Sequence, residues 1–173
     1  MSLDTLHTEG IASSNGAKAK SMLARIQSAK DIASSIPLLI KELKDLWDCE
    51  AITLFALDRD NRQLFSRNII IDSQPEIRVD ISTSSLAGYV AAVGKAVNLV
   101  DAYSQEDLAQ FHPKLSQGST LDSVLSIRTR SLMVLPIPHN KKLVGVMEVI
   151  HRKNGDPFSE QDFKLAREIS PAI

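Results

Sequence analysis

The spacing of apolar residues changes near Trp47, and this change constrains the fold more than any other feature of the sequence. Before it, apolar residues recur every three or four positions, which is typical of amphipathic helices. After it, short runs rich in β-branched and aromatic residues alternate with turn residues, which predicts strands. The helical pattern consists of Ala19, Met22, Ile26, Ala29, Ala33, Ile36, Ile40, Leu43 and Trp47.

Two helices are predicted before the change, at about residues 18–33 and 36–47. Pro37 interrupts the pattern between them. Because proline is tolerated in a first turn, we expect Ser34 or Ser35 to cap the second helix. Strands are expected at 51–57, 63–71, 77–81, 97–100, 131–137 and 143–151, and further helices at 86–93, at 106–111 and after Ser159.

These elements predict an α+β domain: an antiparallel sheet of about six strands with helices on both faces. Gly88 lies inside a short predicted helix, where glycine costs about 1 kcal/mol relative to alanine, so we expect that helix to pack closely on the sheet. Gly145 in a strand indicates a close backbone approach, and Pro136 indicates an edge or a bulge. Ser85 and Gly94 are expected to cap the helix at 86–93.

Length and composition fit a single globular domain. The chain has 173 residues, of which 43% are hydrophobic and 24% charged, which suits one core. Residues 1–16 are poor in apolar side chains and are expected to form a flexible arm. Residues 17–173 are then one domain. The last predicted helix runs to the end of the sequence, so we expect the chain to be a fragment of a larger protein.

Charge and cysteine usage argue against several classes of protein. The formal net charge is -1, so nucleic-acid binding has no electrostatic support. Cys49 is the single cysteine, which excludes an internal disulfide and fits a reducing, cytoplasmic compartment. No stretch approaches the roughly 18 apolar residues that span a bilayer, so membrane insertion is not expected.

Three segments resemble a known family when they are taken in order. They are Ser85–Tyr103, Arg128–Ile137, and Leu143–Ile150 followed by Phe158–Asp162. Together they are similar to the motifs of GAF domains, whose fold is related to that of PAS domains. The resemblance implies a non-catalytic sensory module that regulates an attached effector. Residues 112–130 are also similar to GAF segments joined to bacterial type II secretion or pilus-assembly ATPases.

The resemblance does not fix the ligand. Some members that bind cyclic nucleotides carry a signature that Phe158 and Asp162 match here. His151 and Phe163 depart from it, and Arg152 keeps the charge but not the geometry of lysine. In the family this signature supports the fold. We therefore expect cyclic AMP and cyclic GMP to bind weakly or not at all.

Other branches of the family need groups that this chain lacks or does not space suitably. Members that attach bilins have a cysteine in the irregular loop, whereas Cys49 precedes the first predicted strand. Members that reduce methionine sulfoxide use several cysteines. His112, near Asp101 and Asp107, shows no recognised metal-ligand spacing. No metal site is expected, and the sequence leaves any cofactor unidentified.

Arginines at the start of a predicted buried strand are the leading ligand-binding candidates. Arg128 and Arg130 would stand at the mouth of a pocket between the sheet and residues 101–128. Their guanidinium groups suit carboxylate or phosphate. The alternative is a salt bridge to Asp101 or Asp122. The candidate ligand-binding residues are Arg128, Arg130, Asp101, Tyr103 and Tyr89, of which the two tyrosines are expected either to line the pocket or to pack in the core.

Two functions remain open. The first is a small-molecule sensor, and the second is a ligand-free dimerisation or docking module. An enzyme is not expected, because no nucleophile, P-loop, dinucleotide or metalloprotease motif is present.

The terminal helices are expected to form a homodimer. A second stripe, Ile32, Leu39 and Leu46, lies beside the first one. One stripe can cover the sheet, which leaves the other for a partner chain. The alternative is that both stripes pack into one monomer core, and Pro37 argues against one continuous coil.

Overall fold

The computed structural model describes residues 15–25, 28, 32–66, 76–115 and 130–173. They form an antiparallel sheet of six strands in the order β3-β2-β1-β6-β5-β4. The strands are β1 (Cys49–Asp58), β2 (Gln63–Ser66), β3 (Ile77–Asp80), β4 (Val97–Leu99), β5 (Leu132–His139) and β6 (Lys142–Arg152). The helices are α2 (Ile32–Trp47), α3 (Leu86–Val93), α4 (Gln105–Phe111), α6 (Glu160–Ile169) and the 3-10 turn η1 (Ser170–Ala172), and residues 15–25 are also helical.

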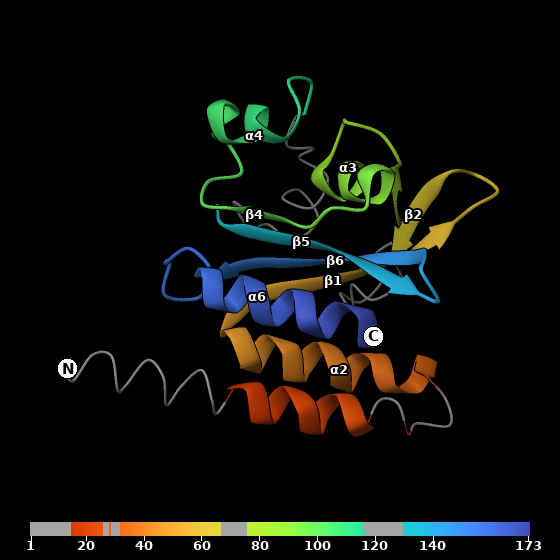
Figure 1. The fold of residues 1–173 in the computed structure, drawn as a ribbon, viewed down its shortest axis with the longest axis vertical. Helices are drawn as coiled ribbons and strands as arrows, with labels where there is room; N and C mark the ends of the chain where they lie inside the picture. Colours follow the sequence, from red (N-terminus) through yellow and green to blue (C-terminus); the bar gives the residue numbers. More distant parts are fainter. Residues whose placement is uncertain (1–14, 26–27, 29–31, 67–75, 116–129) are drawn as a thin grey trace.

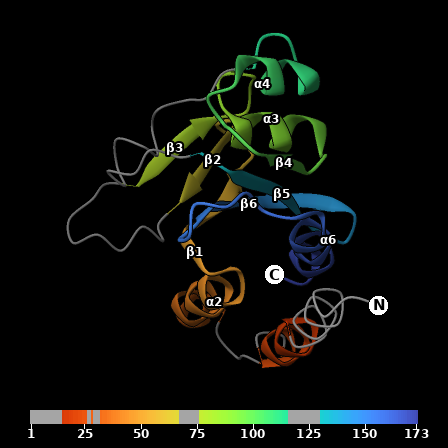
Figure 2. The same cartoon turned by 90° about the vertical axis from the view of Figure 1, so that its left-hand side faces the viewer.

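Helices cover both faces of the sheet, as the sequence predicted. Figures 1 and 2 show α2, α6 and the helical residues 15–25 on one face, and α3 and α4 on the other. The expected α+β fold is therefore confirmed. The predicted strand at 63–71 is seen only as far as Ser66, because residues 67–75 lie outside the described part of the chain.

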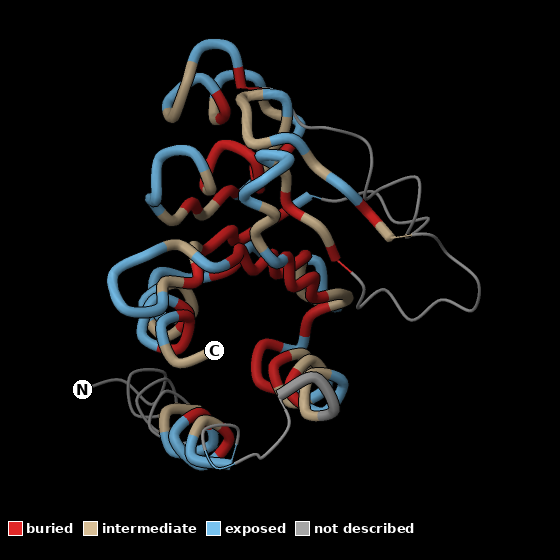
Figure 3. Tube along the Cα trace, turned by 90° about the vertical axis from the view of Figure 1, so that its right-hand side faces the viewer, coloured by how far each residue is buried: buried red, intermediate tan, exposed pale blue. Residues whose placement is uncertain are grey.

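The central strands are buried on both sides, as the colouring of Figure 3 shows. Residues 132–135 of β5 and 145–150 of β6 are all buried. Because side chains alternate across a strand, these two strands contribute to a separate core on each face. None of the helices within the described ranges is both long and apolar enough to cross a bilayer.

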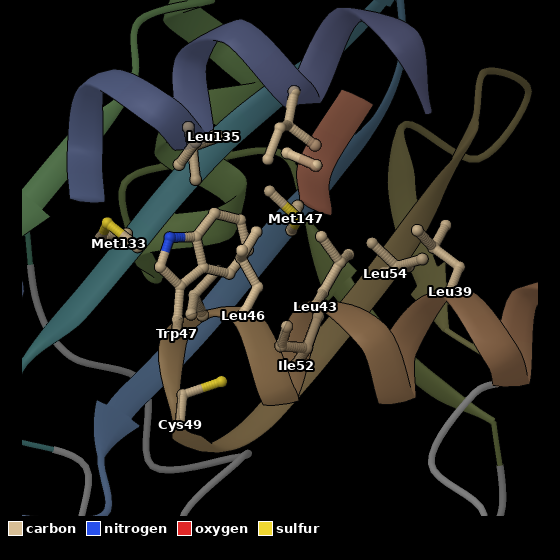
Figure 4. Packing of buried hydrophobic residues seen from close by; sticks show 14 of the residues in the cluster. Leu39, Leu43, Leu46, Trp47, Cys49, Ile52, Leu54, Met133, Leu135 and Met147 are labelled. Atoms are coloured by element: carbon tan, nitrogen blue, oxygen red, sulfur yellow. The ribbon is translucent and has the colours of Figure 1, made fainter. Parts of the chain in front are cut away.

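We name the two cores after the helices that cover them. Figure 4 shows how α2 packs its apolar side chains onto the sheet in the first one. The α2/α6 cluster consists of Ala19, Met22, Leu39, Leu43, Leu46, Trp47, Cys49, Ile52, Leu54, Met133, Leu135, Ile137, Met147, Val149, Phe158, Ala166 and Ile169. The α3/α4 cluster consists of Phe55, Leu64, Ile77, Leu86, Ala87, Tyr89, Val90, Val97, Leu99, Leu108, Leu115, Leu132, Val134, Val146 and Ile150.

The predicted boundary between the first two helices is wrong. Helix α2 begins at Ile32 and continues through Pro37 to Trp47, so neither Ser34 nor Ser35 precedes its first turn. Pro37 lies early in the helix, where its missing N–H removes one hydrogen bond. Burial of Leu43 and Trp47, both 0% exposed, offsets that loss.

The two apolar stripes of these helices do not separate into an inner and an outer one. Met22 and Leu43 of the first stripe and Leu39 and Leu46 of the second all belong to the α2/α6 cluster. The expectation that one stripe stays free is therefore wrong for the described residues. The sheet is wide enough to bury a broad apolar face, which is normal for a globular helix. The side chains of four other stripe members lie outside the described part of the chain: Ile26, Ala29, Ile32 and Ala33.

The predicted caps of α3 and α6 are present. Ser85 Oγ accepts a hydrogen bond from the Gly88 amide, and Gly94 ends α3 in the left-handed conformation with φ 70°. Ser159 caps α6, and Asp162 completes a capping box by accepting from the Ser159 amide at 2.9 Å. Such a box satisfies two otherwise unbonded amides at the start of a helix.

Two glycines allow backbone segments to approach closely, as their positions predicted. A Cβ atom on Gly145 would stand 2.2 Å from the carbonyl oxygen of Phe55 on the neighbouring strand. A Cβ atom on Gly88 would stand 2.2 Å from the carbonyl oxygen of Asp80 at the end of β3. Because both neighbours are backbone atoms, they cannot move aside as a side chain would.

The turn between β1 and β2 carries a charged network. Asp58 accepts hydrogen bonds from the side chain and the amide of Asn61 and from Arg78 Nη1 at 2.8 Å. The Asn61 and Arg78 hydrogen bonds lower the pKa of Asp58 to about 2. Arg78 also lies over the ring of Phe65 at 5.5 Å. These contacts fix the outer strands β2 and β3 to β1.

We predict that Gly88→Ala and Gly145→Ala each lower the free energy of unfolding by roughly 1–3 kcal/mol, because the added methyl group meets backbone. Gly16→Ala is the matched control. Nothing lies within 4 Å of its added Cβ, so alanine is expected to be neutral or stabilising by up to about 1 kcal/mol. Urea titration followed by circular dichroism measures all three. Wild-type stability of the first two variants would contradict the packing.

Candidate functional site

The α3/α4 face of the sheet carries polar side chains among aliphatic ones. Phe55 of β1 and Val146 and Ile150 of β6 belong to the α3/α4 cluster. By strand alternation, Thr53 and Glu148 point to the same face. They are directly opposite each other across β1 and β6, and only 1% and 3% exposed.

A buried carboxylate at the centre of a sheet is costly unless it is hydrogen-bonded or charge-paired. Glu148 interrupts an otherwise apolar run in β6, and an aliphatic residue would satisfy packing alone. Polar side chains on an apolar face are also a feature of ligand sites. Neither Thr53 nor Glu148 is among the site residues predicted from the sequence. The one available signal was a glutamate at an inward-facing position of a predicted buried strand.

Tyr89 connects α3 to α4 from inside the core. It is 8% exposed, and its hydroxyl donates to the carbonyl of Phe111 at 3.1 Å. Its ring lies 6.2 Å from that of His112 in a tilted arrangement. Of the two expectations for Tyr89, the structure shows the core position. Its role at this site is to hold the end of α4 against α3.

Three of the predicted ligand-binding residues lie together at one edge of the same face. The backbones of Ala102 and Arg130 are joined by a hydrogen bond of 2.7 Å, which brings the segment after β4 beside the start of β5. Asp101 Oδ1 accepts from the Tyr103 amide at 2.9 Å. Tyr103 is 42% exposed and Arg130 is also exposed. We call Asp101, Tyr103 and Arg130 the rim.

The alternative role of the two arginines, a salt bridge to Asp101 or Asp122, is tested here for Arg130 and Asp101. Among the ion pairs of the described ranges, none joins Arg130 to Asp101. Arg128 and Asp122 lie outside the described residues, so the role expected of Arg128 stays a prediction. The same holds for most of the 112–130 segment on which the resemblance to secretion ATPases rests.

The described part of the chain shows no arrangement of side chains suited to metal binding or to thiol catalysis. No group of three His, Cys, Asp or Glu side chains there is placed to hold a metal ion. His112 Nδ1 instead accepts from the Lys114 amide at 3.1 Å. Cys49 is buried on the α2/α6 side, and burial raises the pKa of its thiol to about 12. It therefore stays protonated near neutral pH.

The residues of the cyclic-nucleotide signature lie on the opposite side of the sheet from the rim. Arg152 Nη1 pairs with Asp162 Oδ2 at 3.3 Å, and Phe158 is buried in the α2/α6 cluster. Arginine thus keeps an ion pair with the first turn of α6. These contacts fix α6 to the sheet, which agrees with a structural role for the signature.

Comparison with known proteins identifies a family and several relatives. The family model described as "GAF domain" matches residues 31–173. A probable 3',5'-cyclic phosphodiesterase, pde-5, of Caenorhabditis elegans is 27% identical over 147 residues, covering 76% of this chain and 19% of that protein. The dual 3',5'-cyclic-AMP and -GMP phosphodiesterase 11 of Drosophila melanogaster is 35% identical over 96 residues, covering 55% of this chain and 6% of that protein.

Solved structures share the fold at low sequence identity. The GAF domain of an Acinetobacter phosphoenolpyruvate-protein phosphotransferase has a TM-score of 0.68 and 16% identity, covering 99% of this chain and 91% of that one. The free methionine-R-sulfoxide reductase of Neisseria meningitidis, in complex with its substrate, has a TM-score of 0.67 and 16% identity, covering 93% and 86%. The fold therefore occurs both as a domain of a phosphotransferase and in a methionine sulfoxide reductase.

We predict that Tyr89→Phe loosens α4 with little effect on the whole domain. The ring is kept, while loss of the hydrogen bond to Phe111 costs about 1 kcal/mol. Hydrogen exchange should accelerate at the amides of α4 and stay unchanged in α6. Tyr89→Leu also removes buried ring volume and is expected to destabilise the entire domain. Unchanged exchange in α4 for Tyr89→Phe would show that the hydroxyl does not hold this helix.

Proposed function

The chain belongs to the GAF domain family, and on this premise we propose that it binds a small anionic molecule against the α3/α4 face of its sheet and signals to an attached effector. The family consists of regulatory and sensory modules. The observation that carries the proposal is the placement of the rim at the edge of a face whose centre holds Thr53 and Glu148. Polar groups that converge on one apolar face are typical of ligand sites.

The rim supplies the groups that fit an anion with an apolar part. Arg130 presents an exposed guanidinium group, which forms paired hydrogen bonds with carboxylate or phosphate. Tyr103 offers an exposed aromatic face beside it. Asp101 shapes the turn, since it accepts from the Tyr103 amide.

We infer that the module is not itself an enzyme. The methionine sulfoxide reductase that shares the fold is an enzyme, so the fold alone does not decide this. Here the only cysteine is buried with a raised pKa, which leaves no reactive thiolate. The proposed compartment is the reducing cytoplasm. Incubation with free methionine sulfoxide and a reductant is expected to give no turnover.

The effector belongs to the rest of a longer protein. The chain spans 19% or less of the first two curated relatives, which are named as cyclic phosphodiesterases. Their substrates are therefore not assigned to this domain. We keep the expectation that cyclic AMP and cyclic GMP bind weakly, because His151 and Phe163 replace the signature residues.

Thermal shift with a panel of anions tests ligand binding. Inorganic phosphate, citrate, cyclic AMP and cyclic GMP are added to wild type and to Arg130→Gln. A ligand at a hundredfold its Kd stabilises by about 2.7 kcal/mol, which corresponds to roughly 5–10 °C in Tm for a domain of this size. We predict such a shift with phosphate or citrate in wild type and its loss in Arg130→Gln. Lys41→Gln, an exposed cation on α2, is the control.

Two results would overturn parts of the proposal. A shift that persists in Arg130→Gln would place the anion elsewhere. No shift with any member of the panel would favour the ligand-free docking module instead. Calorimetry with either cyclic nucleotide that gives a micromolar or tighter Kd would refute the expectation of weak binding.

We further propose a homodimer through the terminal helices, on a surface that combines Ile36 of the first stripe with side chains outside both stripes. An apolar groove of about 170 Å³ lies beside α2, and its lining includes Ile36, Val144 and Ile173. Val144 of β6 is 40% exposed, and Leu38 of α2 is 54% exposed. A second copy that covered these side chains would remove apolar surface from water.

Sedimentation velocity tests this interface. Wild type is expected to be dimeric at high micromolar concentration, and Leu38→Glu is expected to be monomeric because the charge cannot be buried without a partner. Lys114→Glu, exposed after α4 on the opposite side of the sheet, serves as the control and should stay dimeric. A monomeric wild type excludes the dimer. A dimer that survives Leu38→Glu would place the interface elsewhere.

A further inference from the structure

A second groove lies on the side of the sheet away from the rim, at the end of α6. It has a volume of about 430 Å³. Its walls come from the turn after α3, the outer half of β5, α6 and η1. The lining residues that matter for its chemistry are Lys95, Pro136, Pro138, Phe163, Arg167 and Pro171. Three prolines and an aromatic ring thus form an apolar floor between two cations.

The charge of this groove is one-sided. No carboxylate lines it, although the chain as a whole has a formal net charge of -1. Lys95 and Arg167 are both exposed, and neither forms an ion pair with a described carboxylate. Arg167 instead lies over the ring of Phe163 at 6.0 Å. Lys141 and Lys142, exposed at the turn that follows Pro138, add positive charge nearby.

The strand edge in this groove cannot accept another strand in the usual way. Strand β4 pairs with β5 only as far as the Val97–Val134 pair, whereas β5 continues to His139. Pro136 and Pro138 occupy the remaining edge and have no N–H to donate. Prolines on an edge block strand addition. A partner must therefore be recognised through its side chains.

We propose that this groove docks an acidic peptide segment of a partner protein. Carboxylates of the segment pair with Lys95 and Arg167, and an apolar side chain between them packs on the prolines and Phe163. Charge complementarity selects the segment and steers its approach. Exposed ion pairs contribute only about 0–1 kcal/mol each. Burial of the apolar side chain on the prolines and Phe163 therefore supplies the rest of the affinity. This site is independent of the proposed ligand site at the rim.

The test uses a defined probe. A short synthetic peptide with leucine and phenylalanine flanked by glutamates is titrated into the isotope-labelled domain at low salt, and amide shifts are followed by NMR. The largest shifts are expected at Lys95, Ala96, Phe163 and Arg167. The double variant Lys95→Glu/Arg167→Glu is expected to bind at least about tenfold more weakly. Binding should also weaken as salt is added.

Controls separate docking from general charge attraction. Lys18→Glu/Lys41→Glu reverses two exposed cations on the N-terminal helices and should leave the affinity unchanged. A peptide with glutamine in place of every glutamate should fail to bind. Unshifted groove amides, or full affinity in the Lys95→Glu/Arg167→Glu variant, would overturn the proposal. So would displacement of the peptide by free glutamate or inorganic phosphate at equal concentration, because the groove would then recognise a small anion.

Discussion

The structure depends on the burial of β5 and β6 on both faces of the sheet. A strand that is covered on both sides requires a helical layer on each, and α2 with α6 supplies one while α3 supplies the other. The close contact of Gly145 with the Phe55 carbonyl lets β1 complete this centre. The shorter strands at the two edges then have only to extend a sheet that is already buried.

Two-sided burial also gives the two faces different chemistry. The α2/α6 cluster is a continuous apolar core that includes both ends of the described chain, from Ala19 to Ile169. The α3/α4 face holds Thr53 and Glu148 at its centre and ends at the rim. A ligand on one face can therefore influence helices on the other only through the shared central strands. This arrangement suits a module in which binding at the proposed ligand site is transmitted to the terminal helices.

The residues of the family signature attach α6 to the sheet. Arg152 and Asp162 fix the start of α6 to the end of β6, while the Ser159 capping box fixes the helix itself. These contacts hold the helix that lines the groove containing Arg167 and Phe163. The Arg152–Asp162 ion pair thus accounts for the signature by a structural role, which is separate from the ligand proposed for the opposite face.

The order of helices and strands could be predicted from the sequence, because hydrophobic periodicity, capping residues and glycines are local signals. Ser85, Gly94 and Ser159 marked helix ends correctly, and Gly88 and Gly145 marked close backbone contacts. Tertiary structure alone decided where α2 begins, since packing of its apolar side chains outweighs the cost of Pro37. It also decided that both helical stripes are buried, that Tyr89 holds α4, and that Thr53 meets Glu148. Each of these depends on which distant strands become neighbours, and a local pattern in the sequence carries no record of strand order.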